Sequence, residues 1–394
     1  MYSVYLCLGL LAVAPIVAAS YMAPPVIGGK TPKKSAAAEV LGELDAYTFP
    51  IYGSIMLFSL FLILKYVPKE WSVLAMKAYF TLMGVFLTVD TLRDVMIGGL
   101  ARIGIKVPDY EAISQQAEGA APALDGSLFG RLTRPYHLRL SRFGSSEYLF
   151  ELDFDIFHLL SMAITLPLNV AFLMTGNWIV NNILALLFSY RALCSMRIDT
   201  FRTGFILLVG LFFYDIFWVF ATPVMVHVAK NIDAPVKLVW PSVGADGAVR
   251  FSMLGLGDII IPGIFIVLTM SFDLFLKKKR ILADLKRKSP DVQNPSLPTI
   301  SVWTHGANVY FRSAMLAYCL GLVATVVVMI FFKSAQPALL YLSPACIAAV
   351  AIPAFLRGEF KDVLSFNSSS LEEDEPTPEA TGAAAVTADA DKTD

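Results

Sequence analysis

Residues 210–220 are GLFFYDIFWVF, and residues 254–263 are LGLGDIIIPG. Each stretch belongs to an apolar run long enough to cross a membrane, and each contains one carboxylate, Asp215 in the first and Asp258 in the second. A charged side chain near the middle of a bilayer costs roughly 2.5–3.5 kcal/mol on insertion scales, so it is rare without a function. Two such residues in consecutive spans predict a paired-carboxylate site inside the membrane.

The composition indicates a polytopic membrane protein. The chain has 394 residues, of which 56% are hydrophobic and 16% are charged, whereas soluble globular proteins carry about 25% charged residues. The mean hydropathy is +0.64. The four cysteines lie far apart and form no C-x-x-C pair, so they indicate neither a disulfide framework nor a zinc site. We interpret them as small packing residues.

Nine apolar segments have about the 20 residues that a helix needs to cross the hydrocarbon core. We therefore predict an all-α polytopic fold of nine transmembrane helices, with short hairpins in the loops. The predicted spans are 4–22, 49–67, 71–92, 154–175, 177–195, 203–229, 254–276, 310–332 and 335–356. The predicted parts are a first helix with a basic linker (1–48), helices two to five with a long cytosolic loop at 93–153 (49–195), helices six to nine (196–360), and an acidic disordered tail (361–394).

Lysine and arginine are distributed unevenly between alternate loops. Cytosolic loops of membrane proteins carry an excess of both residues. This excess falls on the cytosolic side if the N-terminus is lumenal and the C-terminus cytosolic. The densest basic segment, KKKRILADLKRK at 277–288, is then predicted to be a cytosolic loop that anchors the topology. We expect the first helix to be retained, because no basic segment precedes it, although Val17-Ala18-Ala19 leaves cleavage open.

Two loops contain alternating segments that are typical of β-hairpins. In the loop 101–150, YHLRL and EYLFEL flank the turn residues 143–146. In the segment 236–251, VKLVW and AVRF flank the turn residues 244–247. Residues 367–394 are acidic and of low complexity, which is typical of a disordered segment.

Three motifs occur in order, each on a predicted span: FYDIFWVF (213–220), LGLGDIIIPG (254–263) and QPALLYLSP (336–344). They resemble the YD, G-x-G-D and PAL motifs of the signal peptide peptidase family of intramembrane aspartic proteases, to which presenilins are more distantly related. GNWIVNN (176–182) and the segment 344–360 are also similar to that family. A lone G-x-G-D is a weak signal, whereas three ordered motifs are specific. The resemblance does not extend to the loop around 101–135 or to the tail.

The resemblance implies that Asp215 and Asp258 form the catalytic pair of an aspartic endopeptidase. Two neighbouring carboxylates share one proton, so the ionised one can activate water while the protonated one binds the scissile carbonyl. The hairpin before Asp258 is a candidate edge for strand addition by an unwound substrate. Tyr214 either hydrogen-bonds the pair or faces the helix bundle. The residues expected to shape the site are Tyr214, Gly255, Leu256, Gly257, Pro337, Ala338 and Leu339.

Two glycines and a proline have separate physical explanations. Gly255 and Gly257 allow the backbone to come close to whatever Asp258 binds, or allow helices to pack closely. Pro337 suits the first turn of the ninth helix, where its missing N–H costs nothing.

Two other aspartates lie in or near predicted spans. Asp273 is expected near the cytosolic face, where it meets Lys277, and Asp90 is expected to be a packing or interface residue.

The resemblance further implies hydrolysis of membrane-spanning helices, notably signal-peptide remnants and type II membrane segments, in the endoplasmic reticulum membrane. Water is then the co-substrate, and we expect no cofactor, no metal and no nucleic-acid partner. The oligomeric state is open, with a homo-oligomer as one alternative. A proton- or cation-coupled transporter using the same carboxylates is the alternative function, and a silent scaffold for membrane helices is a third. The absence of a clear internal repeat and the presence of the PAL segment argue against a transporter.

Overall fold

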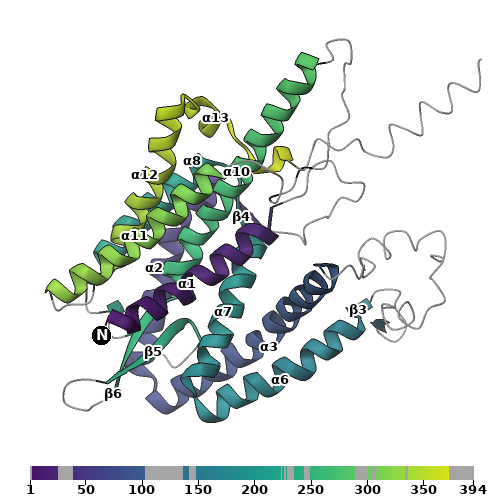
Figure 1. Ribbon diagram of the computed structural model, residues 1–394. Helices are drawn as coiled ribbons and strands as arrows, with labels where there is room; N and C mark the ends of the chain where they lie inside the picture. The colour runs from purple at the N-terminus through teal and green to yellow at the C-terminus, as the bar shows by residue number, and fades with distance from the viewer. Residues whose placement is uncertain are drawn as a thin grey trace, which may run out of the picture. The chain divides into compact units, whose positions relative to one another are not determined.

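Helices dominate the computed structural model of the chain (Figure 1). The structure describes residues 2–24, 39–102, 136–141, 148–222, 224–225, 228, 235–243, 249–288, 300, 302, 308–332 and 336–371. Within these residues nine helices are long and apolar enough to cross a membrane, which confirms the predicted polytopic fold. They are α1 (Tyr2–Met22), α2 (Glu43–Tyr66), α3 (Lys69–Arg102), α6 (Ile156–Thr175), α7 (Trp178–Ser195), α8 (Phe201–Ile216) with its π-helical continuation η1 (Phe217–Ala221), α10 (Gly257–Lys288), α11 (Val309–Phe332) and α12 (Leu339–Arg357).

Three helices extend well beyond their predicted spans, and the first of them, α2, begins at Glu43 instead of residue 49. α10 continues through the basic segment 277–288, so the prediction of a loop there is wrong. Lys, Arg, Leu and Ala are strong helix formers, and the basic last turn complements the helix dipole. α3 similarly continues through residues 93–102, the beginning of the predicted loop. The sixth span is shorter than predicted, because its continuous helix ends at Ala221.

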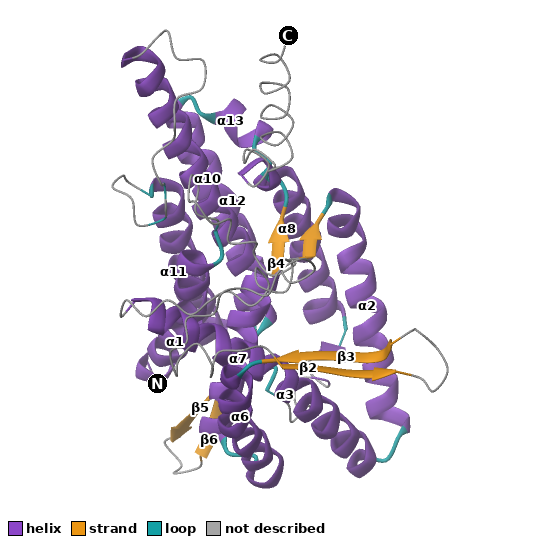
Figure 2. Ribbon diagram, turned by 90° about the vertical axis from the view of Figure 1, so that its right-hand side faces the viewer, coloured by secondary structure: helices purple, strands orange, loops and turns teal. Residues whose placement is uncertain are grey.

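Both predicted hairpins are confirmed in the strands that the structure describes (Figure 2). β2 (Tyr136–Ser141) pairs antiparallel with β3 (Tyr148–Phe154), and β5 (Lys237–Val243) pairs antiparallel with β6 (Val249–Gly255). The turns of both hairpins lie outside the described residues. A further pair, β1 (Glu39–Leu41) with β4 (Met196–Ile198), is parallel and was not predicted.

The chain divides into two compact units, and the first contains residues 1–8, 62–191 and 229–256. Here α3 packs along α6. Asp155 begins α6 as its N-cap in a capping box with His158, and Gly176, in the left-handed conformation with φ 59°, ends it. Asn169 is buried on α6 and donates a hydrogen bond to the carbonyl of Thr165 at 2.9 Å.

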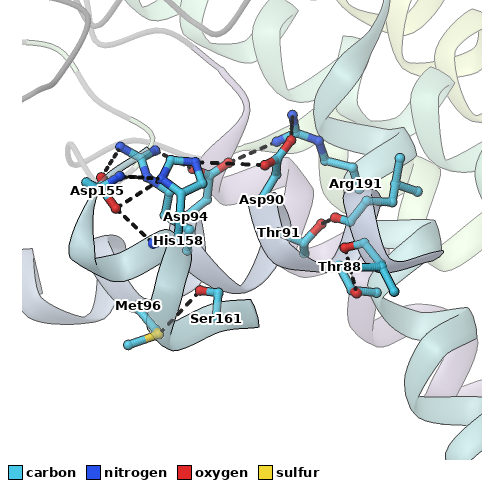
Figure 3. A network of polar contacts seen from close by, with 12 residues as sticks. Thr88, Asp90, Thr91, Asp94, Met96, Asp155, His158, Ser161 and Arg191 are labelled. Carbon is cyan, nitrogen blue, oxygen red and sulfur yellow. Dashed lines mark hydrogen bonds and ion pairs between the residues drawn. The ribbon is translucent and has the colours of Figure 1, made fainter. Parts of the chain in front are cut away.

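A polar network joins three helices of this unit (Figure 3). Arg93 of α3 donates to the Asp155 carboxylate at 2.9 Å, and Arg191 of α7 pairs with Asp94 at 3.0 Å and with Asp90 at 3.5 Å. Burial by itself raises the pKa of Asp155, but the hydrogen bonds from His158 and Arg93 outweigh it and hold that pKa well below its ordinary value. Asp90 of α3 pairs with Arg191 of α7, so it lies at a helix interface, as predicted.

The second unit contains residues 9–61, 192–228 and 257–394, and α10 is its central helix. Within the apolar window of α10, 83% of the residues are buried. α8, α11 and α12 all pack on α10. On α11, side chains at helical spacing are buried and those on the other face are exposed and apolar, as expected for a helix with one face toward lipid. The rings that contact one another around α10 are Phe201, Phe265, Phe272, Phe275, Tyr310 and Phe366.

The ordered chain continues past α12 into the segment predicted to be a disordered tail. The short helix α13 (Phe360–Ser365) and the 3-10 turn η2 (Ser368–Leu371) are both described. Lys279 of α10 pairs with Asp362 at 2.7 Å, and the Ser368 amide donates to the Asp199 carbonyl at 2.8 Å. These contacts explain the order up to Leu371. The remainder of the predicted tail lies outside the described residues.

Candidate active site

Asp215 lies at the end of α8, just before the helix changes to the π-helical turn η1. Thr200 caps the beginning of α8 by accepting a hydrogen bond from the Thr203 amide at 3.2 Å. The Asp215 side chain is buried, and its Oδ2 atom has no hydrogen-bond partner among the described residues. Buried polar atoms without a partner are uncommon, and a functional role is one explanation for them. π-Helical turns within helices also occur frequently at such sites.

Asp258 lies in the first turn of α10. β6 ends at Gly255 and α10 begins at Gly257, so the chain changes from strand to helix immediately before this carboxylate. Asp258 is half-buried, and it interacts electrostatically with Asp215. Two carboxylates from neighbouring helices of one unit are therefore close enough to influence each other.

The segment 337–339 lies against the same carboxylates. Pro337, Ala338 and Leu339 are all buried, and the Leu339 backbone hydrogen-bonds the Asp215 carboxylate. α12 begins at Leu339 with Ala338 as its N-cap, so Pro337 precedes the helix. The prediction that Pro337 occupies the first turn is therefore wrong by two residues, although a proline just outside the helix still leaves the first-turn amides free.

Tyr214 faces another helix of the unit. Its ring lies 3.6 Å from the position that a Cβ on Gly53 of α2 would occupy, and its centroid is 6.3 Å from that of Trp218. The Trp218 indole in turn donates to the Ser54 hydroxyl at 3.0 Å. Tyr214 also interacts electrostatically with Asp215. The sequence left open whether Tyr214 hydrogen-bonds the two aspartates or faces the helix bundle. The contacts with Gly53 and Trp218 support the second alternative.

The three residues before Asp258 have different surroundings. Gly255 closes β6 by pairing with Lys237, and the Leu256 amide donates to the Val236 carbonyl at 3.0 Å. Gly257 is exposed, and a Cβ placed on it would meet no described atom within 4 Å. Close helix packing therefore does not explain Gly257 in the described structure. The open space beside it leaves room next to Asp258.

Tyr318 of α11 is a neighbour of Asp258 that the sequence did not single out. The side chain is fully buried, and its hydroxyl donates to the backbone carbonyl of Asp258 at 3.3 Å. The signal that could have found it is the buried stripe of α11, in which Tyr310, Ala314 and Tyr318 recur at intervals of four residues. That pattern identifies a buried face, but not the atom it contacts.

Comparisons with known proteins relate the chain to one family. The family model described as signal peptide peptidase matches residues 33–370. The signal peptide peptidase of Mus musculus is 33% identical over 335 residues, which cover 84% of this chain and 75% of that protein. Intramembrane protease 2 of Caenorhabditis elegans is 41% identical over 228 residues, covering 57% and 46%. A probable intramembrane protease of Schizosaccharomyces pombe is 32% identical over 335 residues, covering 85% and 86%. The region matched by the family model includes both aspartates and the segment 337–339.

Proposed function

This chain belongs to the signal peptide peptidase family, and we propose that it hydrolyses membrane-spanning helices with Asp215 and Asp258 as its catalytic pair. Membership of the family makes it an intramembrane peptidase and gives the transporter alternative no support. The single observation that carries the assignment of the residues is that these two carboxylates interact electrostatically where α8, α10 and α12 pack together. Among the acidic residues on the predicted spans, Asp215 and Asp258 are the two that lie in the YD and G-x-G-D motifs.

The proposed reaction needs only the two carboxylates and a water molecule. One carboxylate, ionised, takes a proton from water as the oxygen attacks the scissile carbonyl carbon. The other, protonated, donates a hydrogen bond to the carbonyl oxygen and stabilises the gem-diol. Return of a proton to the leaving nitrogen then breaks the peptide bond. Because the two groups titrate together, neither role is assigned to one aspartate alone.

The contacts around the pair support this chemistry. The unpartnered Oδ2 of Asp215 is able to accept a hydrogen bond from water or from the protonated partner. The Leu339 backbone contact and the Tyr318 contact to the Asp258 backbone orient the two acids from α12 and α11. Preoriented dipoles of this kind contribute to catalysis because they need no rearrangement during the reaction.

We propose signal-peptide remnants and type II membrane segments as substrates, with the endoplasmic reticulum membrane as the location. A lumenal N-terminus and a cytosolic C-terminus follow from the charge distribution. Residues 196–360 are proposed to hold the catalytic helices. Homo-oligomerisation is part of the proposal only as an open alternative, since no described contact bears on it.

The β5–β6 hairpin is proposed to receive the unwound substrate. β6 ends three residues before Asp258, so a peptide paired with β6 would be led toward that carboxylate by the chain itself. Phe251 and Met253 of β6 have exposed fractions of 50% and 46%. An added strand would give the peptide backbone hydrogen bonds in place of those lost when its helix opens.

The proposal is tested by cleavage of a signal-peptide-derived membrane peptide by the purified protein in detergent micelles. We expect Asp215→Asn and Asp258→Asn each to lower kcat by at least about a thousandfold, because each removes one half of the acid–base pair. Asp90→Asn, a matched substitution on α3, should cleave like the wild type. An aspartyl transition-state mimic should block the wild type. Cleavage that survives in both active-site variants, or a folded wild type that cleaves nothing, would overturn the proposal.

A further inference from the structure

The first turns of α7 hold the hairpin through side chains of the GNWIVNN motif. Asn182 donates from Nδ2 to the Val239 carbonyl at 2.7 Å and accepts from the Val239 amide on Oδ1 at 2.8 Å. Asn181 donates from Nδ2 to the Lys237 carbonyl at 2.8 Å. The rings of Trp178 and Trp240 meet edge to face with centroids 5.4 Å apart. These contacts lie within one compact unit.

The strand register shows which edge of the hairpin these asparagines occupy. Val239 pairs with Met253, and it directs both of its backbone groups to Asn182 instead of to β6. In an antiparallel pair, residues whose backbone groups point away from the partner strand alternate with residues whose backbone groups bond to it. Lys237 and Pro241 share this outward direction, and Pro241 has no N–H to satisfy. Two carboxamides thus bond three outward groups of β5, which are the Lys237 carbonyl and both backbone groups of Val239, and Pro241 presents no outward N–H.

The same alternation determines the outward groups of β6. Phe251 pairs with Pro241 and Met253 pairs with Val239, so the backbone groups of Phe251 and Met253 point away from β5. Both side chains are about half exposed. A peptide approaching the hairpin therefore meets one edge at which asparagines already bond three backbone groups, and a second edge at which the outward groups of Phe251 and Met253 have no bonded partner within the described residues.

We infer that Asn182, assisted by Asn181, is a positioning residue that acts as a side-chain substitute for a β-strand. The carboxamide presents one donor and one acceptor at the spacing of a peptide group, so it bonds Val239 as a neighbouring strand would. Both asparagines are 94% buried, and a buried amide without partners would be costly. This clamp holds the hairpin to α7 and directs an extended peptide to β6. The inference about substrate rests on the proposed function, whereas the clamp itself does not.

Hydrogen exchange tests the clamp without any cleavage assay. In the wild type the Val239 amide should be protected, since its N–H is bonded to a buried oxygen. In Asn182→Ala we expect exchange within residues 237–243 to become at least about tenfold faster. Asn169→Ala, which removes a buried asparagine from α6 of the same unit, should leave this segment unchanged. Equal protection in the wild type and Asn182→Ala would overturn the clamp.

Enzyme kinetics test the effect on the substrate. We expect Asn182→Ala to raise KM by about tenfold with kcat within about threefold of the wild type, because a mobile hairpin is competent to bind for a smaller fraction of time. Val239→Pro removes the partner N–H from the other side, at an outward position like that of Pro241. If the two groups bond each other, the double variant should have the same KM as Asn182→Ala alone, because Val239→Pro removes a bond that Asn182→Ala has already removed. Independent, multiplicative effects would contradict the bond.

The outcomes separate the two proposals. A wild type that cleaves no membrane peptide contradicts the proposed function, whereas faster exchange in Asn182→Ala would still support the clamp. An active wild type with an unchanged KM in Asn182→Ala overturns the role of the clamp in substrate binding. Should Asn182→Ala fail to fold, Asn181→Ala loses the bond to Lys237 and a longer 3.4 Å contact to Asn182 but keeps both bonds between Asn182 and Val239, and we then expect a smaller rise in both exchange and KM. Wild-type behaviour in that variant would count against the inference.

Discussion

Asp273 provides a demanding test of how α11 is held against α10. This carboxylate is buried in the middle of α10, and it accepts hydrogen bonds from two backbone amides in the first turn of α11. The distances are 2.9 Å from the Phe311 amide and 3.3 Å from the Tyr310 amide. First-turn amides have no partner within their own helix. Asp273 therefore caps α11 from another helix, in addition to interacting with Lys277 as predicted.

The expected cost of Asp273→Ala follows from these contacts. Each hydrogen bond to a charged group contributes about 1.5–3 kcal/mol, so the loss of two should lower the free energy of unfolding by about 3–6 kcal/mol. Asp273→Asn keeps one neutral acceptor, and we expect it to lose about half as much. The control is Asp90→Ala, whose carboxylate is 49% exposed and pairs with Arg191 at 3.5 Å. Such a pair contributes about 0–1 kcal/mol.

The measurement is unfolding by SDS titration in mixed micelles, followed by tryptophan fluorescence. The order of stability should be wild type, Asp90→Ala, Asp273→Asn and then Asp273→Ala. If Asp273→Ala unfolds at the same SDS fraction as Asp90→Ala, the two amides of α11 must have other partners. The reasoning that assigns the helix cap to Asp273 would then be refuted.

Two further predictions concern the hairpin and the polar network. Phe251→Pro removes an outward N–H of β6 without breaking a bond to β5, so cleavage should fall by about tenfold. The control Phe251→Ala keeps the N–H and should cleave faster than Phe251→Pro. Equal turnover by the two variants would refute strand addition at this edge. The lowered pKa of Asp155 means that its ionised form stabilises the fold at pH values above its ordinary pKa, and that this contribution is lost as the pH falls toward the lower, folded-state value. Near neutral pH, Asp155→Asn should lower the free energy of unfolding by about 1.5–3 kcal/mol. This difference from the wild type should shrink below about pH 4. A difference independent of pH would contradict the stabilising role of the ionised Asp155 carboxylate.

Local sequence accounts for the helices and for most of their boundaries. The nine spans follow from apolar length alone, since a chain in lipid must satisfy its backbone groups internally. Both hairpins follow from alternation around turn residues. At 277–288 the change from apolar to basic residues predicts the end of the helix, but α10 continues through it. Helix propensity continues across that change, so the helix continues with it.

The partners of each side chain were decided by the tertiary structure. The sequence identified Asp215, Asp258 and the segment 337–339 as candidates, but the interaction between the two acids and the Leu339 backbone contact depend on how α8, α10 and α12 pack. Tyr318, Asn182 and the capping role of Asp273 lie far along the chain from the groups they contact. Hydropathy and motifs describe a residue by its neighbours in sequence. A hydrogen bond between helices depends on the rotation and crossing of both, which are set by the packing of every side chain between them.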